Sequence, residues 1–517
     1  MANDLHEQGV AAYKAGDYQL SEKLIRSAVN LDDKNPSFYI NLGSALIASR
    51  RYSPALMSLS RAIDLDPKIS VAHYLMGLVM QEMGNAAAAL ESTNKSLALQ
   101  PNFASALILR GNLLSKLGNA QLAIADYTAA IHLNSDDALA YFNLANALRS
   151  QGRMAEALTA FDQALKLEPN FVQALCNKAN TERDLMQISE AEITYKLAIQ
   201  LEPANHQLLW NLSLLQLQLG NYKEGWKNYE NRLLDPLLPS IKTDAIAWHK
   251  HLNLQGKTIL VICEQGLGDM IQFARYVTCL HHKGAEVTLQ VPDVLVDLMK
   301  SLDGVQSVIS LQSDLPKTDF YCMLMSLPFE LGTELNTIPF NSVPYLNPTQ
   351  KSTNKWQKLL PKTQSPRIGL VVRGNPKNPR DQQRSIRLSD LVKFLPPQAH
   401  YVLLQDRIDQ EDAATLHQYP HIYSIHDEIS SFDDTAAACS QMDWIITVDT
   451  AVAHLSGALG VPAWVIIPFA SDWRWLIDRT DTPWYSKSRL FRQSKSHEWT
   501  EVFCDLSKAL NASLLSN

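Results

Sequence analysis

A pattern of small and large side chains recurs every 34 residues through the N-terminal part of the chain. Such a period predicts stacked helical hairpins, because each hairpin buries its apolar face only against its neighbours. Prolines that would end the second helix stand at Pro67, Pro101, Pro169 and Pro203. Small residues, where two helices must approach closely, form two series: Gly9, Gly43, Gly77, Gly111, Ala145, Ala179 and Ser213, then Ser21, Ala55, Ala89, Ala123, Ala157, Ala191 and Gly225.

These positions resemble the tetratricopeptide repeat family over residues 2–232, with six full repeats and a seventh that runs into the next domain. The resemblance implies a superhelix with a concave groove. Two residues before the first small position, an asparagine recurs in register at Asn41, Asn143, Asn177 and Asn211.

An amide side chain both donates and accepts hydrogen bonds, so this ladder could hold the backbone of an extended peptide. The tetratricopeptide O-linked sugar transferases carry a similar ladder, and that resemblance implies a polypeptide guest. The alternative is that the asparagines bond neighbouring helix ends or water.

A different pattern follows a connector at 233–256, which contains two prolines. Short apolar runs alternate with helical or loop segments, which predicts parallel sheets with crossover helices. We expect two Rossmann-type domains, 257–350 and 366–500, and a C-terminal helix at 501–517. The predicted strands cover 258–263, 287–291, 305–311, 320–327, 368–372, 400–404, 421–425, 444–448 and 463–467.

Two segments, GLGDMIQFARYV and VDTAVAHLSGALGVPAWVIIP, resemble glycosyltransferase family nine, the heptosyltransferase-like group. The chain resembles more closely bacterial proteins that fuse tetratricopeptide repeats to such a domain, in which EQGLGD and PFASDWRWLIDRTDTPWY also appear. The implied fold class is an α-solenoid followed by a GT-B pair of α/β domains, with the donor nucleotide bound mainly by the second. The aromatic residues Trp473, Trp475, Trp484 and Tyr485 are expected to pack in the core rather than to stack on a sugar.

The segment Asp449-Thr450-Ala451-Val452-Ala453-His454 follows a predicted strand and opens a helix. Its free backbone amides and helix dipole would suit a pyrophosphate, and Thr450 and His454 lie four residues apart on one helical face. The alternative is a capping threonine and a core histidine.

Loss of a nucleoside diphosphate requires positive charge or a metal. No convincing DxD motif is present, so a metal-independent site without a cofactor is expected, with a nucleotide sugar as substrate. Arg373 and Arg384 belong to a basic strip that could face the phosphates, although it could equally be a solvated loop. Gln405 and Asp409 follow a predicted strand and are candidates for the ribose or base.

Asp269 ends the loop that contains Gly266 and Gly268. In the resembled family this aspartate is proposed as the base that deprotonates the acceptor hydroxyl during an inverting transfer, and the two glycines are assigned here to the donor site. A carboxylate does this only if burial or poor solvation raises its basicity. The competing interpretation is a helix cap beside two turn glycines.

Charge and composition exclude some other classes. The 46 basic and 53 acidic side chains give a net charge of −7, which argues against nucleic acid as the main partner. The N-terminus lacks a leader, no apolar run is long enough to span a bilayer, and the six cysteines stand singly, so the cytoplasm is the expected location. The leading hypothesis is a glycosyltransferase whose repeats recruit a polypeptide or glycan acceptor, and the alternative is a noncatalytic scaffold that binds partners through its repeats.

Overall fold

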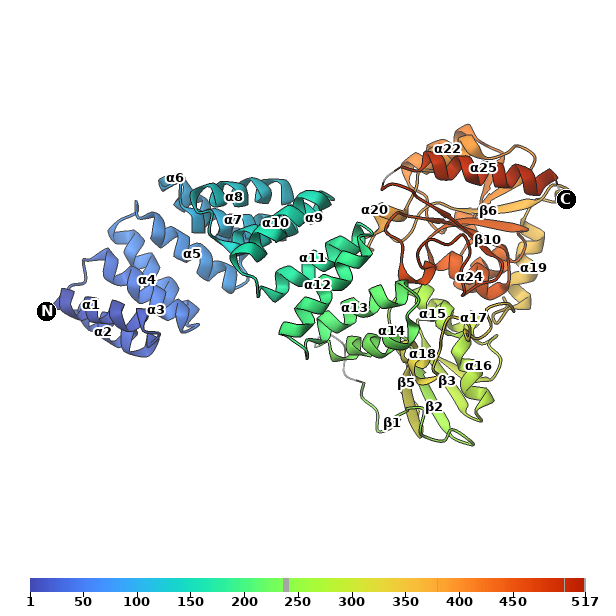
Figure 1. Ribbon diagram of the computed structural model, residues 1–517, viewed down its shortest axis with the longest axis horizontal. Helices are drawn as coiled ribbons and strands as arrows, with labels where there is room; N and C mark the ends of the chain where they lie inside the picture. Colours follow the sequence, from blue (N-terminus) through green and yellow to red (C-terminus); the bar gives the residue numbers. More distant parts are fainter. Residues whose placement is uncertain (236–240, 379, 497, 516–517) are drawn as a thin grey trace. The chain divides into compact units, whose positions relative to one another are not determined.

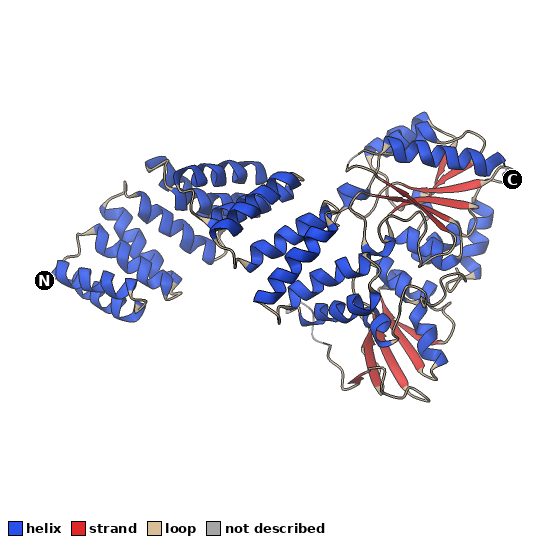
Figure 2. Cartoon of the chain, in the orientation of Figure 1, coloured by secondary structure: helices blue, strands red, loops and turns tan. Residues whose placement is uncertain are grey.

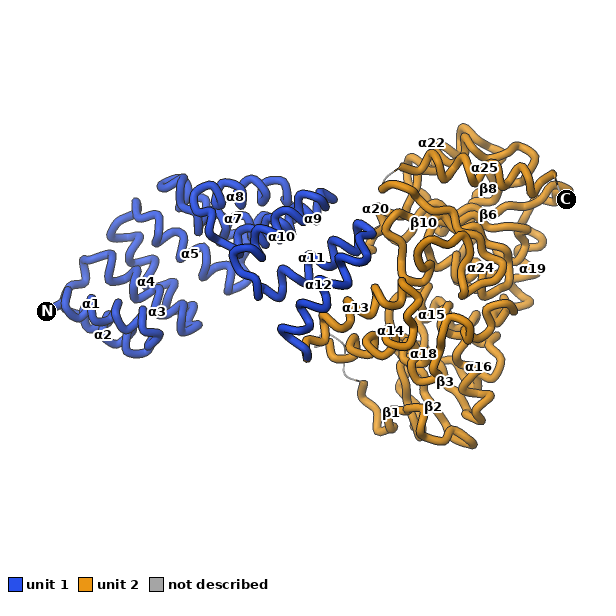
Figure 3. The backbone as a smooth tube through the Cα atoms, viewed as in Figure 1, with its two compact units in different colours: residues 1–203 blue, residues 204–517 orange. Residues whose placement is uncertain are grey.

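The computed structural model describes residues 1–235, 241–378, 380–496 and 498–515. The chain forms two compact units, residues 1–203 and residues 204–517 (Figure 3). Helices alone build the first unit, whereas the second contains helices and two sheets (Figure 2).

The first unit is a series of helical hairpins (Figure 1). The turn inside a hairpin needs a residue with positive φ, and glycine adopts this conformation without strain, as Gly118 does at +80°. The helices are α1 (Ala2–Lys14), α2 (Tyr18–Leu31), α3 (Pro36–Ala48), α4 (Tyr52–Leu65), α5 (Ser70–Glu82), α6 (Ala86–Leu99), α7 (Ala104–Lys116), α8 (Ala120–Leu133), α9 (Ala138–Ser150), α10 (Met154–Leu167), α11 (Val172–Asp184) and α12 (Ile188–Leu201).

The small residues of the repeat lie where the two helices of one hairpin touch. A Cβ atom added to Gly43 would stand 2.8 Å from Cδ2 of Leu59, and one added to Gly111 would stand 2.6 Å from Cε1 of Tyr127. Real side chains do not approach so closely, so a larger residue would push the helices apart. The close approach predicted from the sequence is therefore confirmed at these positions.

The second unit begins with another helical hairpin, α13 (His206–Gln218) and α14 (Tyr222–Tyr229), followed by the 3₁₀ turn η1 (Glu230–Leu234). The repeat period extends to residue 232, but the contacts of this last hairpin group it with the sheets. Trp226 of α14 is buried, with its ring centroid 5.9 Å from that of Phe273 and 5.3 Å from that of Trp473. The seventh hairpin is thus part of the core of the α/β unit.

Both sheets are parallel throughout. The first has the order β1-β5-β2-β3-β4 and the second the order β11-β10-β9-β6-β7-β8. The strands are β1 (Ile246–Ala247), β2 (Thr258–Ile262), β3 (Glu286–Val291), β4 (Val305–Ser310), β5 (Phe320–Met323), β6 (Arg367–Val371), β7 (His400–Leu403), β8 (Ile422–Ser424), β9 (Trp444–Val448), β10 (Ala463–Ile467) and β11 (Ser488–Arg492). If the strands of the second sheet are numbered 1 to 6 along the chain, so that β6 is strand 1 and β11 is strand 6, their order across the sheet from β8 to β11 is 3-2-1-4-5-6. This is the strand order of the doubly wound α/β fold.

The α/β prediction is confirmed for a mixed region with parallel sheets, with three differences. The expected strand at 320–327 ends at Met323, because the chain turns there into helical segments, Leu324–Ser326 and α18. Strand β1 falls in the predicted connector, and β11 was not predicted. The helices of this region are α15 (Leu267–Phe273), α16 (Arg275–His282), α17 (Val296–Met299), α18 (Leu327–Glu330), α19 (Gln350–Leu359), α20 (Asp381–Arg384), α21 (Leu388–Leu391), α22 (Gln410–Gln418), α23 (Phe432–Cys439), α24 (Ala451–Leu459) and α25 (Thr500–Leu515).

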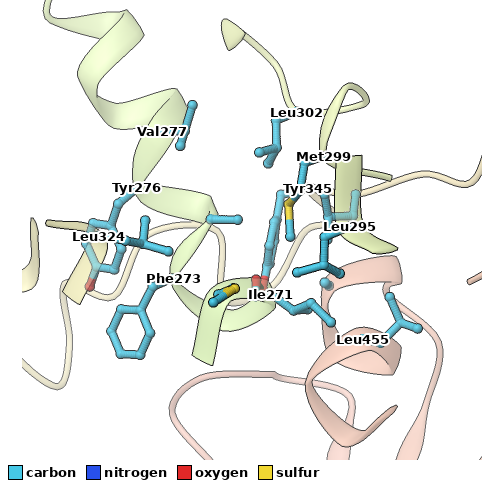
Figure 4. Close-up of a cluster of buried hydrophobic side chains, with 14 of the residues drawn as sticks. Ile271, Phe273, Tyr276, Val277, Leu295, Met299, Leu302, Leu324, Tyr345 and Leu455 are labelled. Atoms are coloured by element: carbon cyan, nitrogen blue, oxygen red, sulfur yellow. Dashed lines mark hydrogen bonds between the residues drawn. The ribbon is translucent and has the colours of Figure 1, made fainter. Parts of the chain in front are cut away.

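One hydrophobic core continues from the first sheet to the second. Figure 4 shows Leu455 of α24 next to Ile271 of α15, with Tyr345 from the intervening chain in the same cluster. Arg275 of α16 is fully buried beside these residues and donates hydrogen bonds to the backbone carbonyls of Pro339 and Trp484. The two sheets are therefore held together through α15, α16 and α24.

Candidate functional site

The candidate site lies at the carboxyl edge of the second sheet, where β6 and β9 are neighbours. These strands are far apart in the chain, and their connections lead away in opposite directions, which leaves a crevice beyond their ends. Arg373 follows β6, and Asp449 and Thr450 follow β9. The structure thus brings together two of the segments that the sequence assigned to the donor.

The first turns of α15 and α24 meet beside this crevice. A Cβ atom added to Gly268 would stand 3.0 Å from Cδ2 of His454 and 3.4 Å from Cα of Ala451. Only glycine allows this approach without displacing a neighbour. The first turn of α15, which follows β2 of the first sheet, therefore lies beside the helix start that carries Thr450. This turn and the residue before it contain Gly266, Gly268 and Asp269.

Thr450 occupies the N-cap position of α24, but its side chain makes no capping bond to the helix. Its hydroxyl lies 3.2 Å from that of Thr447. Of the backbone amides of the first helical turn, that of Ala453 donates to the Thr450 carbonyl at 3.0 Å, whereas those of Ala451 and Val452 have no carbonyl four residues earlier in the helix and so remain suited to an anion.

His454 is a buried, neutral histidine. Its Nδ1 atom lies 3.2 Å from the hydroxyl of Tyr485, and its ring stacks on Trp475 with centroids 5.3 Å apart. Burial, followed by the charge of nearby Arg474, lowers the pKa of His454 to about 3. The side chain consequently brings no positive charge to the site, as the core-histidine alternative expected.

Asp269 has both carboxylate oxygens engaged. Its Oδ2 atom accepts a hydrogen bond from the Gly266 N–H at 2.8 Å, which caps the start of α15. Its Oδ1 atom pairs with the guanidinium of Arg474. The capping role foreseen as the competing interpretation is present, and the role as a base stays a prediction.

Arg474 has three partners and is buried. It donates to Gln272 Oε1 at 2.7 Å and to Asp472 Oδ1 at 2.8 Å, besides Asp269. Burial by itself lowers the pKa of Arg474, but the two carboxylates outweigh burial and raise it. The guanidinium is therefore a permanent positive charge next to the first turn of α15.

Arg384 of α20 lies at the start of α24. Its Nη1 atom donates to the backbone carbonyl of Asp449 at 2.7 Å, and its Nε atom donates to Asp381 at 3.2 Å. Burial, followed by the charge of Asp472, raises the pKa of Asp449 to about 6, while Arg384 opposes this shift. Of the basic strip predicted from the sequence, Arg384 is the member that touches the helix start.

Arg373, Gln405 and Asp409 join the ends of β6 and β7. The Gln405 side-chain oxygen accepts the backbone N–H of Arg373 at 3.0 Å, and Arg373 pairs with Asp409 at 2.9 Å and with Asp412 at 2.5 Å. These residues lie at the predicted sheet edge, but each already has a protein partner, so their role toward a donor stays a prediction.

Three of the four ladder asparagines contact the neighbouring repeat, and Asn211 accepts a hydrogen bond within its own helix. The Asn143 amide donates to Asn112 at 3.2 Å, and the Asn177 amide donates to Asn146 at 2.8 Å. Asn41 lies 2.7 Å from His6, and Asn211 accepts from Gln207. The partners Asn112 and Asn146 are themselves 34 residues apart, a second series that the sequence analysis missed although the period could have revealed it.

Other residues that matter here were also missed. In the sequence, Arg474 stands out only as part of an aromatic segment. The aromatic residues of that segment are buried in the core, which confirms the packing prediction for Trp473, Trp475, Trp484 and Tyr485.

Arg232 of η1 donates to Glu264 at 2.6 Å, and the Tyr229 hydroxyl lies 2.7 Å from the Gln265 amide nitrogen. The last hairpin therefore holds the turn that precedes Gly266.

None of the helices within the four described ranges has both the length and the apolar character that a bilayer crossing requires. The same residues contain no group of three or more His, Cys, Asp or Glu side chains placed to bind a metal ion.

Residues 6–68, 108–170 and 172–205 match tetratricopeptide repeat models. Protein FlbA of Caulobacter vibrioides is 24% identical over a match that covers 57% of this chain and 53% of that protein, so the chain spans about half the length of this curated relative.

Among solved structures, YrrB, described as a TPR protein with an unusual peptide-binding site, is 24% identical, with a TM-score of 0.33, and covers 37% of this chain and 98% of its own. A tetratricopeptide repeat protein from Parabacteroides merdae is 18% identical, with a TM-score of 0.37, and covers 46% of this chain and 94% of its own. The matches to the repeat models show that the N-terminal region of this chain contains tetratricopeptide repeats.

Proposed function

We propose that the protein transfers a sugar from a nucleotide-sugar donor to a polypeptide or glycan acceptor, with inversion and without a metal. The C-terminal unit adopts a GT-B-like arrangement in this proposal, and the repeats recruit the acceptor. The main support is the convergence of two helix starts, α15 and α24, with Arg384 and Arg474 beside them at a sheet edge suited to nucleotides.

In this reaction the acceptor hydroxyl attacks the anomeric carbon from the face opposite the diphosphate. Asp269 takes the hydroxyl proton as the new oxygen–carbon bond forms. The bond between the anomeric carbon and the diphosphate oxygen breaks, and the diphosphate leaves with the electron pair. The amides of the first turn of α24, together with Arg384 and Arg474, stabilise its negative charge.

The test is nucleotide binding followed by donor turnover. Calorimetry with UDP, GDP, CDP and ADP should detect one nucleotide that binds, and the matching nucleotide sugars should release it when acceptors are supplied. Asp269→Ala should bind the donor and lose most turnover. Asp427→Ala, at an exposed site that follows β8 of the second sheet, is the control.

A noncatalytic scaffold is the second candidate. It is favoured by the engagement of Asp269, Arg373 and Gln405 with protein partners, and by the tetratricopeptide repeats, which commonly serve protein interaction. Absence of binding by all four nucleotides would favour the scaffold. Unchanged donor turnover in Asp269→Ala would refute the assignment of the base alone.

A further inference from the structure

The Arg474–Asp269 ion pair joins α15 of the first half to the 3₁₀ turn η6 (Trp473–Trp475) of the second. All three guanidinium nitrogens of Arg474 donate hydrogen bonds, but Asp269 is the one acceptor among them that is proposed to act as the base. Gln272 and Asp472 hold the guanidinium from two other directions. Arg474 could therefore exchange Asp269 for another anion and keep its remaining contacts.

In the observed arrangement Asp269 is poorly prepared to act as a base. Its Oδ1 atom is held by the buried guanidinium of Arg474, whose other counter-ion is Asp472, so an acceptor hydroxyl cannot take that place without leaving Arg474 short of an anion. Its other oxygen is committed to the Gly266 N–H. The proposed chemistry thus requires that Arg474 first acquire a different negative partner.

A diphosphate bound at the start of α24 would supply that partner. Gly268, next to Asp269, touches Ala451 and His454 in the first turn of α24, and Trp475, next to Arg474, stacks on His454. Phosphate oxygens match the planar fork of a guanidinium better than a single carboxylate oxygen does. The buried Nε2 atom of Gln272 also lacks an acceptor within the described part of the chain and lies on the residue that holds Arg474.

We infer that the Arg474–Asp269 pair is a latch that donor binding opens, an inference that rests on the proposed function. The diphosphate of the donor takes the place of Asp269 on Arg474. Asp269 is then free to accept the hydroxyl proton, and Arg474 holds the diphosphate as it leaves with the bonding electrons. The base is thereby activated only when a donor is present, and Arg474 is a donor-binding residue that the sequence motifs did not reveal.

The latch predicts opposite effects of Asp269→Asn on stability and on binding. The asparagine can still accept the Gly266 N–H but no longer pairs with Arg474, so the unliganded thermal midpoint should fall. Because the competing carboxylate is gone, the affinity for the best-bound of UDP, GDP, CDP and ADP should rise by about tenfold, roughly the contribution of one charge-assisted hydrogen bond. A merely structural pair would lower both quantities.

The control is Asp427→Asn, which removes the same charge from an exposed position and should change neither quantity. Arg474→Lys keeps the charge but loses the fork, and it should weaken nucleotide binding about tenfold even if Asp269→Asn fails to fold. If the wild-type protein binds a nucleotide and neither variant shifts its affinity as expected, the latch is wrong while the proposed function stands. If no nucleotide binds to the wild-type protein or to Asp269→Asn, both are overturned.

Discussion

The last hairpin should be essential to the stability of the α/β unit, and Trp226→Ala tests this. The Trp226 ring is 1% exposed and contacts five aromatic rings at centroid distances of 5.3 to 6.5 Å, three of which lie outside the hairpin. Replacing a buried tryptophan by alanine typically costs about 3–5 kcal/mol. Its Nε1 atom has no acceptor within the described residues, so no hydrogen bond adds to the loss. We expect a loss of about 4 kcal/mol.

Urea unfolding can assign this loss to one unit. All ten tryptophans lie at or beyond Trp210, so their fluorescence reports on residues 204–517, whereas circular dichroism at the helical band also follows the repeats. With a urea slope of about 3 kcal/mol per M, the fluorescence midpoint should fall by about 1.3 M. Phe161→Ala, a buried core residue of the repeats, is the matched control and should shift the dichroism alone. A fluorescence midpoint within about 0.3 M of wild type would refute the argument.

Three further predictions concern the groove and the site. Alanine at Asn143 and Asn177 should weaken peptide binding without changing nucleotide affinity. Each lost amide hydrogen bond should also cost the repeats about 1 kcal/mol of stability, measured by thermal unfolding followed by circular dichroism. Unchanged peptide binding would show that the asparagine ladder is not part of a peptide-binding groove. His454 has a pKa lowered to about 3, so it stabilises the fold fully above its unfolded pKa of about 6.5, and this is lost as the pH falls toward 3. The pKa of Asp449 is raised to about 6, so protonation of Asp449 stabilises the fold below pH 6 and opposes the effect of His454. Asp449 is present in both proteins, so the quantity to measure is the difference in fluorescence midpoint between His454→Gln and wild type. This difference should shrink from pH 7 to pH 4, and a constant difference would contradict the assignment. Gly268→Ala should cost about 1–3 kcal/mol in the same assay by pushing α15 away from α24, and a stability equal to wild type would show that this contact is not tight.

The 34-residue period of the sequence was enough to predict the repeats. Positions such as Gly43 and Gly111 recur because each accommodates a large side chain 16 residues later in the same hairpin, a local contact that sequence spacing records directly. The short apolar runs likewise predicted strands such as β6 and β9, because a strand buried on both faces of a parallel sheet must be continuously apolar. The same local logic placed Thr450 at a helix start and Asp269 at a capping position.

Only the tertiary structure decided which of these local features act together. No spacing rule joins Asp269 to Arg474, which lies 205 residues later, or Arg384 to the carbonyl of Asp449. These contacts depend on how the sheets share one core, and that is a property of packing across the whole unit. The sequence by itself therefore determined the elements and supplied the candidate site residues, whereas the fold decided that the candidate base is paired with a buried cation. The physical reason is that helix and strand periods are local, while the partners of a buried charge are chosen by long-range packing.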